Sequence, residues 1–322
     1  MKARSLAIAN DPVGEEAAQE FLLSGGSAVG AVLSGYFAAA GAHSGVLLAP
    51  VSLLIAGVGA GARAFDGRLR QPGRGTKRPR GFKAGETIPP AARLAVPAAV
   101  GALLVAHAYD GSQRLSSIMK SGISRAERTG AEGRAELLRR IRAVGAGAMA
   151  ESAFVRPMLR VAGPSQGGLV TPSDFGAMDD IDQPAGERRL GGLSLSEPSW
   201  AGEWEEADAQ ELGIGCAVCA VDVRGVFAVL SYRRVVDGLA IDELDLEAPL
   251  VAVPVLRGVA RVAPGMPLPA PAPIAIVRDA AGAPSEVIAA PTALRLDDAA
   301  LGGKLLRLRR SQATQEVQIV RA

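Results

Sequence analysis

The chain has 322 residues, of which 48% are hydrophobic and 21% charged, and its formal net charge is +2. This balance excludes a mainly disordered chain and argues against a dedicated nucleic-acid-binding protein, which would carry a large basic excess. The only cysteines, Cys216 and Cys219, form a single C-x-x-C, and the only histidines are His43 and His107. Two cysteines cannot build a disulfide framework, and with two histidines they nearly exclude a four-ligand zinc site within one chain. We therefore expect no metal or cofactor.

The first predicted elements are a strand and two helices. Residues 5–10 form a short, mostly apolar run that is typical of a strand. Asp11 and Pro12 then predict the start of a helix, because Asp caps helix N-termini and Pro fits the first helical position. Ser27 can cap a second helix, predicted over residues 28–40.

Residues 21–62 contain no Asp, Glu, Lys or Arg, a stretch longer than the ~20 apolar residues that suggest a membrane helix. A membrane-associated protein is therefore one interpretation. The stretch is rich in Gly, Ala and Ser rather than Leu, Ile and Phe, so we favour a buried helix followed by a buried strand over residues 45–55. The N-terminus also lacks the apolar region of a signal peptide, and we expect a cytoplasmic protein.

The middle of the chain predicts helices between polar segments. Residues 66–93 are basic and rich in Gly and Pro, which predicts a solvated loop or arm, with docking of an acidic partner as the alternative. Helices are predicted over residues 97–109, 118–128 and 132–161, and a linker with turn signals over 163–192. An acidic block that could cover the basic arm follows, formed by Glu203, Glu205, Glu206, Asp208 and Glu211.

The last third of the chain has the pattern of strands. Residues 216–232 are apolar around an Arg224-Gly225 turn signal, which predicts a β-hairpin. Further strands are predicted over 250–256, 274–278 and 287–290, and a final strand pair within 305–319. Helices followed by strands, with one strand at the N-terminus, indicate a layered α/β (α+β) fold.

Several segments, in order along the chain, resemble the motifs of one enzyme family. Residues 8–31, IANDPVGEEAAQEFLLSGGSAVGA, resemble an A-x-x-P…G-G-N-A-V-D-A segment, and His43-Ser44-Gly45 resembles P-H-S-S-G. Residues 65–68, FDGR, resemble L-D-G-R-E, residues 167–175 resemble G-G-x-(I/L)-T-x-x-D-L, and residues 218–225 resemble F-S-V-V-D-x-x-G. These are motifs of the γ-glutamyltransferase family, and the shared order across most of the chain carries the resemblance, rather than any single match.

The resemblance implies an N-terminal-nucleophile hydrolase fold, an αββα sandwich of two sheets between helical layers. Such enzymes cut themselves just before a Thr, whose freed amine and hydroxyl then carry out acyl transfer. The resemblance also implies a helix-rich part at residues 1–164, a linker at 165–212 and a strand-rich part at 213–322. We expect these parts to form one integrated domain.

The sequence departs from the family at the positions that perform the chemistry. Matching Asp222 to the family's Asp places Gly215 on the nucleophile and Cys216 on the Thr that follows it. The substrate-binding S-S-M segment becomes residues 269–271, PAP, and the S-P-G-G oxyanion segment becomes residues 290–293, APTA. Oxyanion stabilisation alone is typically worth ~3–4 kcal/mol, so these changes together predict a loss of catalysis.

Two residues are candidates for a retained site. Arg68 matches the Arg that binds the substrate carboxylate in the family, although an ordinary basic loop residue is the alternative. Cys216 could serve as an N-terminal nucleophile after self-cleavage of the Gly215-Cys216 bond. Its spacing to Asp222 is one residue shorter than the family's, and a one-residue slip in a strand turns a side chain to the opposite face. The alternative for Cys216 is a small apolar strand residue.

We therefore expect a γ-glutamyltransferase-like protein that has lost catalysis and acts as a non-catalytic subunit or binding module. Its partner would be an active paralogue, another complex subunit or a second copy of the chain. The first alternative is an active γ-glutamyl amide hydrolase or transferase that uses Cys216. The second is a membrane-associated protein that uses residues 21–62.

Overall fold

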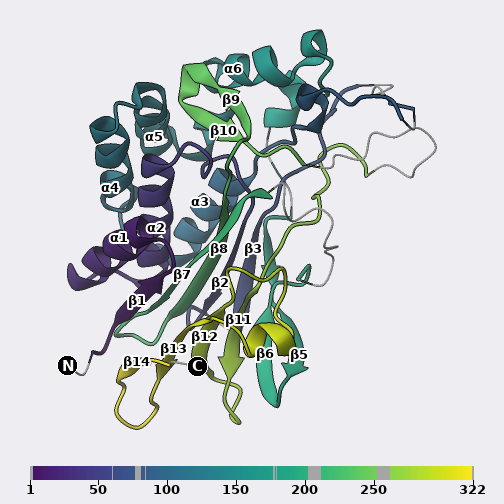
Figure 1. Cartoon of the computed structure of the whole chain (residues 1–322). Helices are drawn as coiled ribbons and strands as arrows, with labels where there is room; N and C mark the ends of the chain where they lie inside the picture. Colours follow the sequence, from purple (N-terminus) through teal and green to yellow (C-terminus); the bar gives the residue numbers. More distant parts are fainter. Residues whose placement is uncertain are drawn as a thin grey trace.

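The computed structural model describes residues 3–59, 61–76, 81–83, 85–176, 178, 180–201, 212–251 and 262–320. Two six-stranded antiparallel sheets pack face to face, and helices cover the outer face of the first sheet (Figure 1). The acidic block at residues 203–211 and most of the strand expected at 250–256 lie outside the described residues.

The first sheet combines strands from both ends of the chain. Its order is β1 (Leu6–Ala9), β7 (Ile214–Val221), β8 (Phe227–Arg234), β2 (Val51–Ala56), β3 (Ala62–Gly67) and β4 (Asp182–Pro184). The β7–β8 hairpin is the one that the Arg224-Gly225 turn signal predicts, and it lies between β1 and β2. The first and last thirds of the chain therefore share one sheet.

The second sheet is built mainly from the C-terminal strands. Its order is β14 (Val317–Ile319), β13 (Leu306–Arg310), β12 (Pro284–Ala289), β11 (Ile274–Arg278), β6 (Leu193–Glu197) and β5 (Gly186–Leu190). Alternate side chains of the two sheets meet in an apolar layer that includes Leu54, Val229, Ile276 and Val287. A separate small hairpin pairs β9 (Leu239–Ile241) with β10 (Leu246–Ala248).

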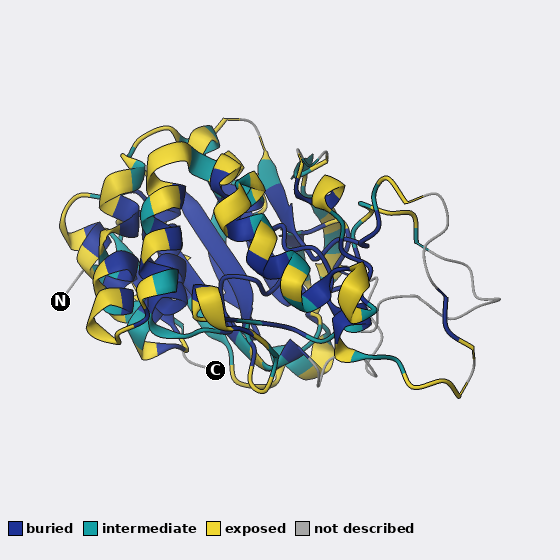
Figure 2. Ribbon diagram, turned by 90° about the horizontal axis from the view of Figure 1, so that it is seen from above, coloured by how far each residue is buried: buried dark blue, intermediate teal, exposed yellow. Residues whose placement is uncertain are grey.

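The helical layer packs on the outer face of the first sheet. It contains α1 (Pro12–Leu23), α2 (Ala28–Ala42), α3 (Ala99–Asp110), α4 (Leu115–Arg128), α5 (Glu132–Val144) and α6 (Ser152–Ala162). Asp11 and Ser27 cap α1 and α2 as the sequence predicts. Figure 2 shows the exposed outer faces of these helices over the buried strands.

Helix α2 is the centre of that layer, because it is buried over nearly its whole length. Its approach to α4 depends on two glycines: a Cβ on Gly41 would lie 2.0 Å from the carbonyl oxygen of Gly122. The charge-free stretch is thus a core helix followed by a core strand. Among the described residues, no helix combines the length and apolar character needed to cross a membrane.

The layered α/β fold predicted from the sequence is confirmed. On the outer face of the second sheet, the described helix is the single turn α7 (Asp298–Leu301), whose Ala300 packs on the apolar residues of that face.

Three local predictions were wrong. Strand β2 begins at Val51, and residues 45–50 are buried coil rather than strand. The supposed solvated arm at 66–93 begins with buried residues, because Arg68 and Arg70 form ion pairs with Asp66. The supposed linker at 163–192 supplies β4 and β5.

Candidate functional site

The residues singled out by the sequence lie at one end of the first sheet. Gly215 of β7 pairs with Arg233 of β8, and the pairs Tyr232–Val51 and Val51–Gly67 continue the register across β2 to β3. Arg68, which directly follows Gly67, therefore lies at the same sheet end as Gly215, three strands away. With strands about 4.8 Å apart, the separation is of the order of 14 Å.

A small cavity of about 10 Å³ lies beside Gly215. Its lining combines the segments that the resemblance assigns to nucleophile, substrate binding and oxyanion hole: Pro50, Gly215, Cys216, Ser231, Tyr232, Arg233, Pro271, Pro273 and Pro291. Among the described residues, this cavity leaves little space for a ligand beside Gly215.

Gly215 itself has no space for a side chain. A Cβ built on this residue would lie 1.7 Å from the carbonyl oxygen of Pro291 and 3.0 Å from Nη1 of Arg233. Contacts below 3.0 Å do not occur for real Cβ atoms, so any nucleophilic residue here would require Pro291 to move. Backbone and guanidinium atoms thus occupy the space that a nucleophile's side chain would need.

The Gly215-Cys216 peptide bond lies inside the β7–β8 ladder rather than at its end. Ile214, Gly215 and Cys216 are all paired with β8 residues. The Asn10 side chain further fixes this peptide: its amide donates to the Gly215 carbonyl at 2.9 Å, and its Oδ1 accepts from the Ala217 amide at 2.8 Å. Cutting here would divide a strand held on both of its edges.

Cys216 points to the helical side of the sheet. It is 3% exposed and belongs to the apolar cluster beneath α1 and α2, whereas Ala217 and Cys219 belong to the cluster between the sheets. Burial, together with the neighbouring Asp11 carboxylate, raises the pKa of the Cys216 thiol to about 11. Since the nucleophilic form of Cys is the thiolate, this thiol is held in its unreactive state.

The C-x-x-C does not form a paired site. Residues three apart in a strand face opposite sides of a sheet, and Cys216 and Cys219 accordingly lie in different apolar clusters. Burial raises the pKa of Cys219 as well. Among the residues that the structure describes, no group of three potential metal ligands comes together.

Arg68 is buried, and its guanidinium group is engaged by the protein itself. The guanidinium binds the Asp66 carboxylate through Nε and Nη2, each at 3.0 Å, and stacks 4.9 Å from the ring centre of Trp200. Trp200 in turn donates to Ser52 of β2 at 3.2 Å. The Arg68 guanidinium therefore binds the carboxylate of Asp66, where the resemblance implies the carboxylate of a substrate.

Sequence reasoning missed a polar cluster on the helical side of Cys216. Tyr232 donates to Asp11 at 3.1 Å, His43 lies 4.0 Å from the same carboxylate, and Arg234 contacts His43 at 3.4 Å. Burial lowers the pKa of His43, which opposes its protonation beside Asp11. The sequence identifies Asp11 as a helix cap, but it carries no signal for the contact of Asp11 with Tyr232, because the two residues are 221 positions apart.

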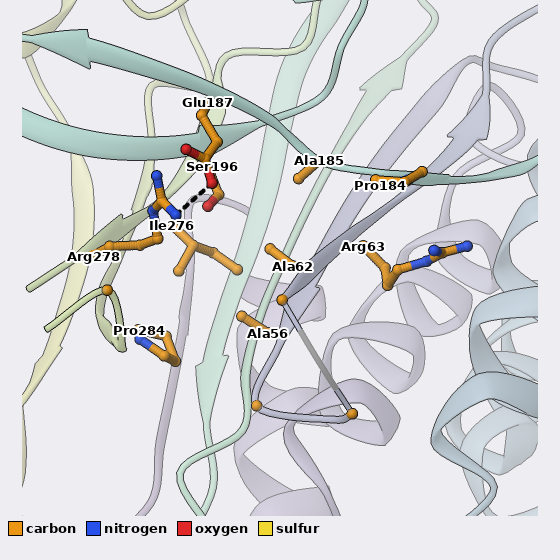
Figure 3. Close-up of a pocket in the computed structure, with 14 residues that line it drawn as sticks. Ala56, Ala62, Arg63, Pro184, Ala185, Glu187, Ser196, Ile276, Arg278 and Pro284 are labelled. Atoms are coloured by element: carbon orange, nitrogen blue, oxygen red, sulfur yellow. Dashed lines mark hydrogen bonds and ion pairs between the residues drawn. The ribbon is translucent and has the colours of Figure 1, made fainter.

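A larger cavity, of about 420 Å³, opens at the opposite end of the two sheets (Figure 3). The turn between β2 and β3, with Gly57, Gly59 and Gly61, forms one wall, and the ion pair of Glu187 with Arg278 forms another. Arg63 points away from this cavity toward Asp182, to which it is bound. The charged side chains around this cavity are thus already paired, Glu187 with Arg278 and Arg63 with Asp182.

The chain is similar in fold to several solved structures. LmbA2991HD superimposes with a TM-score of 0.73 at 11% identity, covering 99% of this chain and 97% of that chain. A second form of LmbA2991 gives 0.69 at 12% identity over the same shares. The cephalosporin acylase of Bacillus halodurans gives 0.64 at 11% identity, covering 89% of this chain and 77% of its own.

The chain has the fold of the N-terminal-nucleophile hydrolases. At these identities the likeness concerns the fold alone. No family model matches the sequence, and no curated protein matches it. Gly215, which the sequence resemblance aligns with the nucleophile, lies on β7 of the first sheet.

Proposed function

We propose that the protein is a non-catalytic member of this fold, with γ-glutamyltransferase-like segments, that acts as a subunit or binding module. One observation carries the proposal: Gly215 cannot accommodate a side chain, because the Pro291 carbonyl fills that space. The internal pairing of Arg68 with Asp66 supports it. Binding would then involve a protein partner or a second copy of the chain, in the cytoplasm.

The test is an assay of the purified full-length chain with γ-glutamyl-p-nitroanilide, combined with its intact mass. We expect no release of p-nitroaniline above the uncatalysed rate and a single species of 32.9 kDa. The alternative, an enzyme that uses Cys216, requires two fragments, with the smaller one beginning at Cys216. Turnover that disappears in Cys216→Ala would establish that alternative and overturn the proposal.

The binding role needs its own measurement. Light scattering after size exclusion, together with mass spectrometry of proteins that co-purify from the native cell, should reveal self-association or one stoichiometric partner. A monomer that retains no partner at micromolar concentration would contradict the subunit role.

A further inference from the structure

A groove of about 620 Å³ runs between helices α1 and α4, with Ser34 of α2 in its lining. Figure 1 shows the two helices at the same edge of the helical layer. On α4 the lining residues recur from Ser117 to Arg128, which at 1.5 Å per residue makes about 16 Å of groove wall. Neither Gly215 nor Arg68 lines this groove, so it is separate from the site at the sheet end.

The two walls of the groove carry opposite charges. Helix α1 contributes the acidic residues Glu16 and Glu20, and helix α4 contributes the basic residues Lys120, Arg125 and Arg128. Arg125 is already paired with Glu16 across the groove. Glu20, Lys120 and Arg128 are exposed and form no ion pair with any residue that the structure describes. Their charges are therefore available to a binding partner.

The outer face of α1 has the shape and charge that the groove lacks. Glu16, Glu20 and Leu23 follow one another at i, i+4 and i+7, so they form one ridge along the helix. Leu23 is 85% exposed, more than any other large apolar side chain in the described part of the chain. The ridge cannot fill the groove of its own chain, because α1 is one wall of that groove. A second copy brings an acidic ridge to the basic wall.

We infer that two copies of the chain associate about a two-fold axis, with the α1 ridge of each copy in the α1–α4 groove of the other. A two-fold axis makes every contact occur twice. Glu20 of each copy then lies against Lys120 and Arg128 of the other copy, and the two α1 helices pack side by side at the axis. Leu23 is removed from water in the same step. This inference rests on the proposed binding role and names a second copy as the partner.

The test is sedimentation and light scattering of the full chain at micromolar concentration and low salt, where we expect a dimer. Glu20→Lys and Lys120→Glu should each weaken self-association by about 30-fold, because each reverses an exposed ion pair that the axis repeats. Both side chains are exposed, so circular dichroism should show an unchanged fold. An equimolar mixture of the two variants should restore the dimer, since a mixed pair has one unaltered contact and one with both charges exchanged.

Two further variants complete the test. Leu23→Ser should weaken the dimer by at least about tenfold, because it removes an apolar side chain that association buries. Arg156→Glu is the matched control: Arg156 is an exposed cation of α6 that forms no ion pair with the described residues and does not line the groove. Its dimer should be as strong as that of the unsubstituted protein.

Three results would overturn the inference: a monomer, a mixture of Glu20→Lys and Lys120→Glu that does not associate, or an equal loss in Arg156→Glu. A monomer that retains another stoichiometric partner would overturn the two-fold dimer and leave the subunit role standing. Turnover of γ-glutamyl-p-nitroanilide by an intact dimer would instead overturn the non-catalytic role and leave the dimer standing.

Discussion

At the scale of single residues, one position in the strand register decides the character of the site. The sequence predicted that Cys216 stands one residue from the family's nucleophile position, and that such a slip reverses the face. The structure places Cys216 under the helices and Gly215 between the sheets. The sequence could not predict that the Pro291 carbonyl would occupy the space at Gly215, because that contact joins segments 76 positions apart.

The buried Cys216 thiol predicts a loss of stability at alkaline pH. Its pKa is about 11 in the folded chain against 9.0 ordinarily, so the folded state keeps the proton to a higher pH than the unfolded state. The contribution of Cys216 to the free energy of unfolding should be constant below pH 9 and fall by about 3 kcal/mol as the pH rises from 9 past 11. Urea titrations at pH 8 to 11 measure it.

Cys216→Ala should reduce this alkaline loss, while Cys219 continues to contribute in the same direction. In the native protein at pH 8, iodoacetamide should label neither cysteine within a time that labels both in urea. Rapid labelling of Cys216 under native conditions would contradict a buried, protonated thiol.

At the scale of elements, the Arg224-Gly225 turn signal predicted the β7–β8 hairpin, because the residues that make a turn are close in sequence. The β7–β8 and β11–β12 turns are both D-x-x-G: the Oδ1 atoms of Asp222 and Asp279 each accept from the amides two and four residues ahead. The β5–β6 hairpin was missed, since residues 186–197 contain no β-branched or aromatic side chain. Their strand conformation depends on pairing of β6 with the distant β11.

The two aspartates form a matched pair for measuring a longer-range contact. Asp222 is 1% exposed, and its Oδ2 also accepts from the Ala28 amide at the start of α2, at 3.2 Å, and pairs with Arg224. Asp279 is partly exposed and, beyond the turn bonds, accepts one 3.5 Å bond from Gln312. Asp222→Asn should lower the free energy of unfolding by about 2–3 kcal/mol, because it removes a buried charge-assisted bond and the favourable helix-end interaction.

Asp279→Asn is the control and should cost less than about 1 kcal/mol, because it perturbs a turn of the same geometry with more solvent around it. Chemical denaturation of the three proteins measures both values. Equal losses in the two variants would show that the contact with α2 contributes nothing beyond the turn itself.

At the scale of the whole molecule, the two parts of the chain on either side of residues 202–211 are interleaved. In the first sheet, β7 and β8 lie between β1 and β2, and in the second sheet β11 pairs with β6. The resemblance implied two packed sheets and one integrated domain, without the order of the strands. Composition and hydrophobic pattern could not predict that order, because it depends on contacts between residues about 200 positions apart.

Interleaving predicts that a cut between residues 201 and 212 leaves the fold assembled. After a protease site is inserted there and cleaved, the two fragments should co-elute at the retention volume of the uncut protein, because separating them would open two ladders and the core between the sheets. Size exclusion before and after cleavage measures this. Separation of the fragments without denaturant would contradict the arrangement.

The same strand order has a consequence for synthesis on the ribosome. By the time α6 has been made, the residues of β1 and of the β2–β3 hairpin have been synthesised. The positions of β7 and β8 between them in the sheet stay empty until Arg234 has emerged. Until then β1 lacks its partner β7, and one edge of β2 exposes unpaired backbone groups. The nascent chain must keep its most apolar segment protected over roughly 200 residues of elongation, which makes completion of the sheet a late and non-local step of folding.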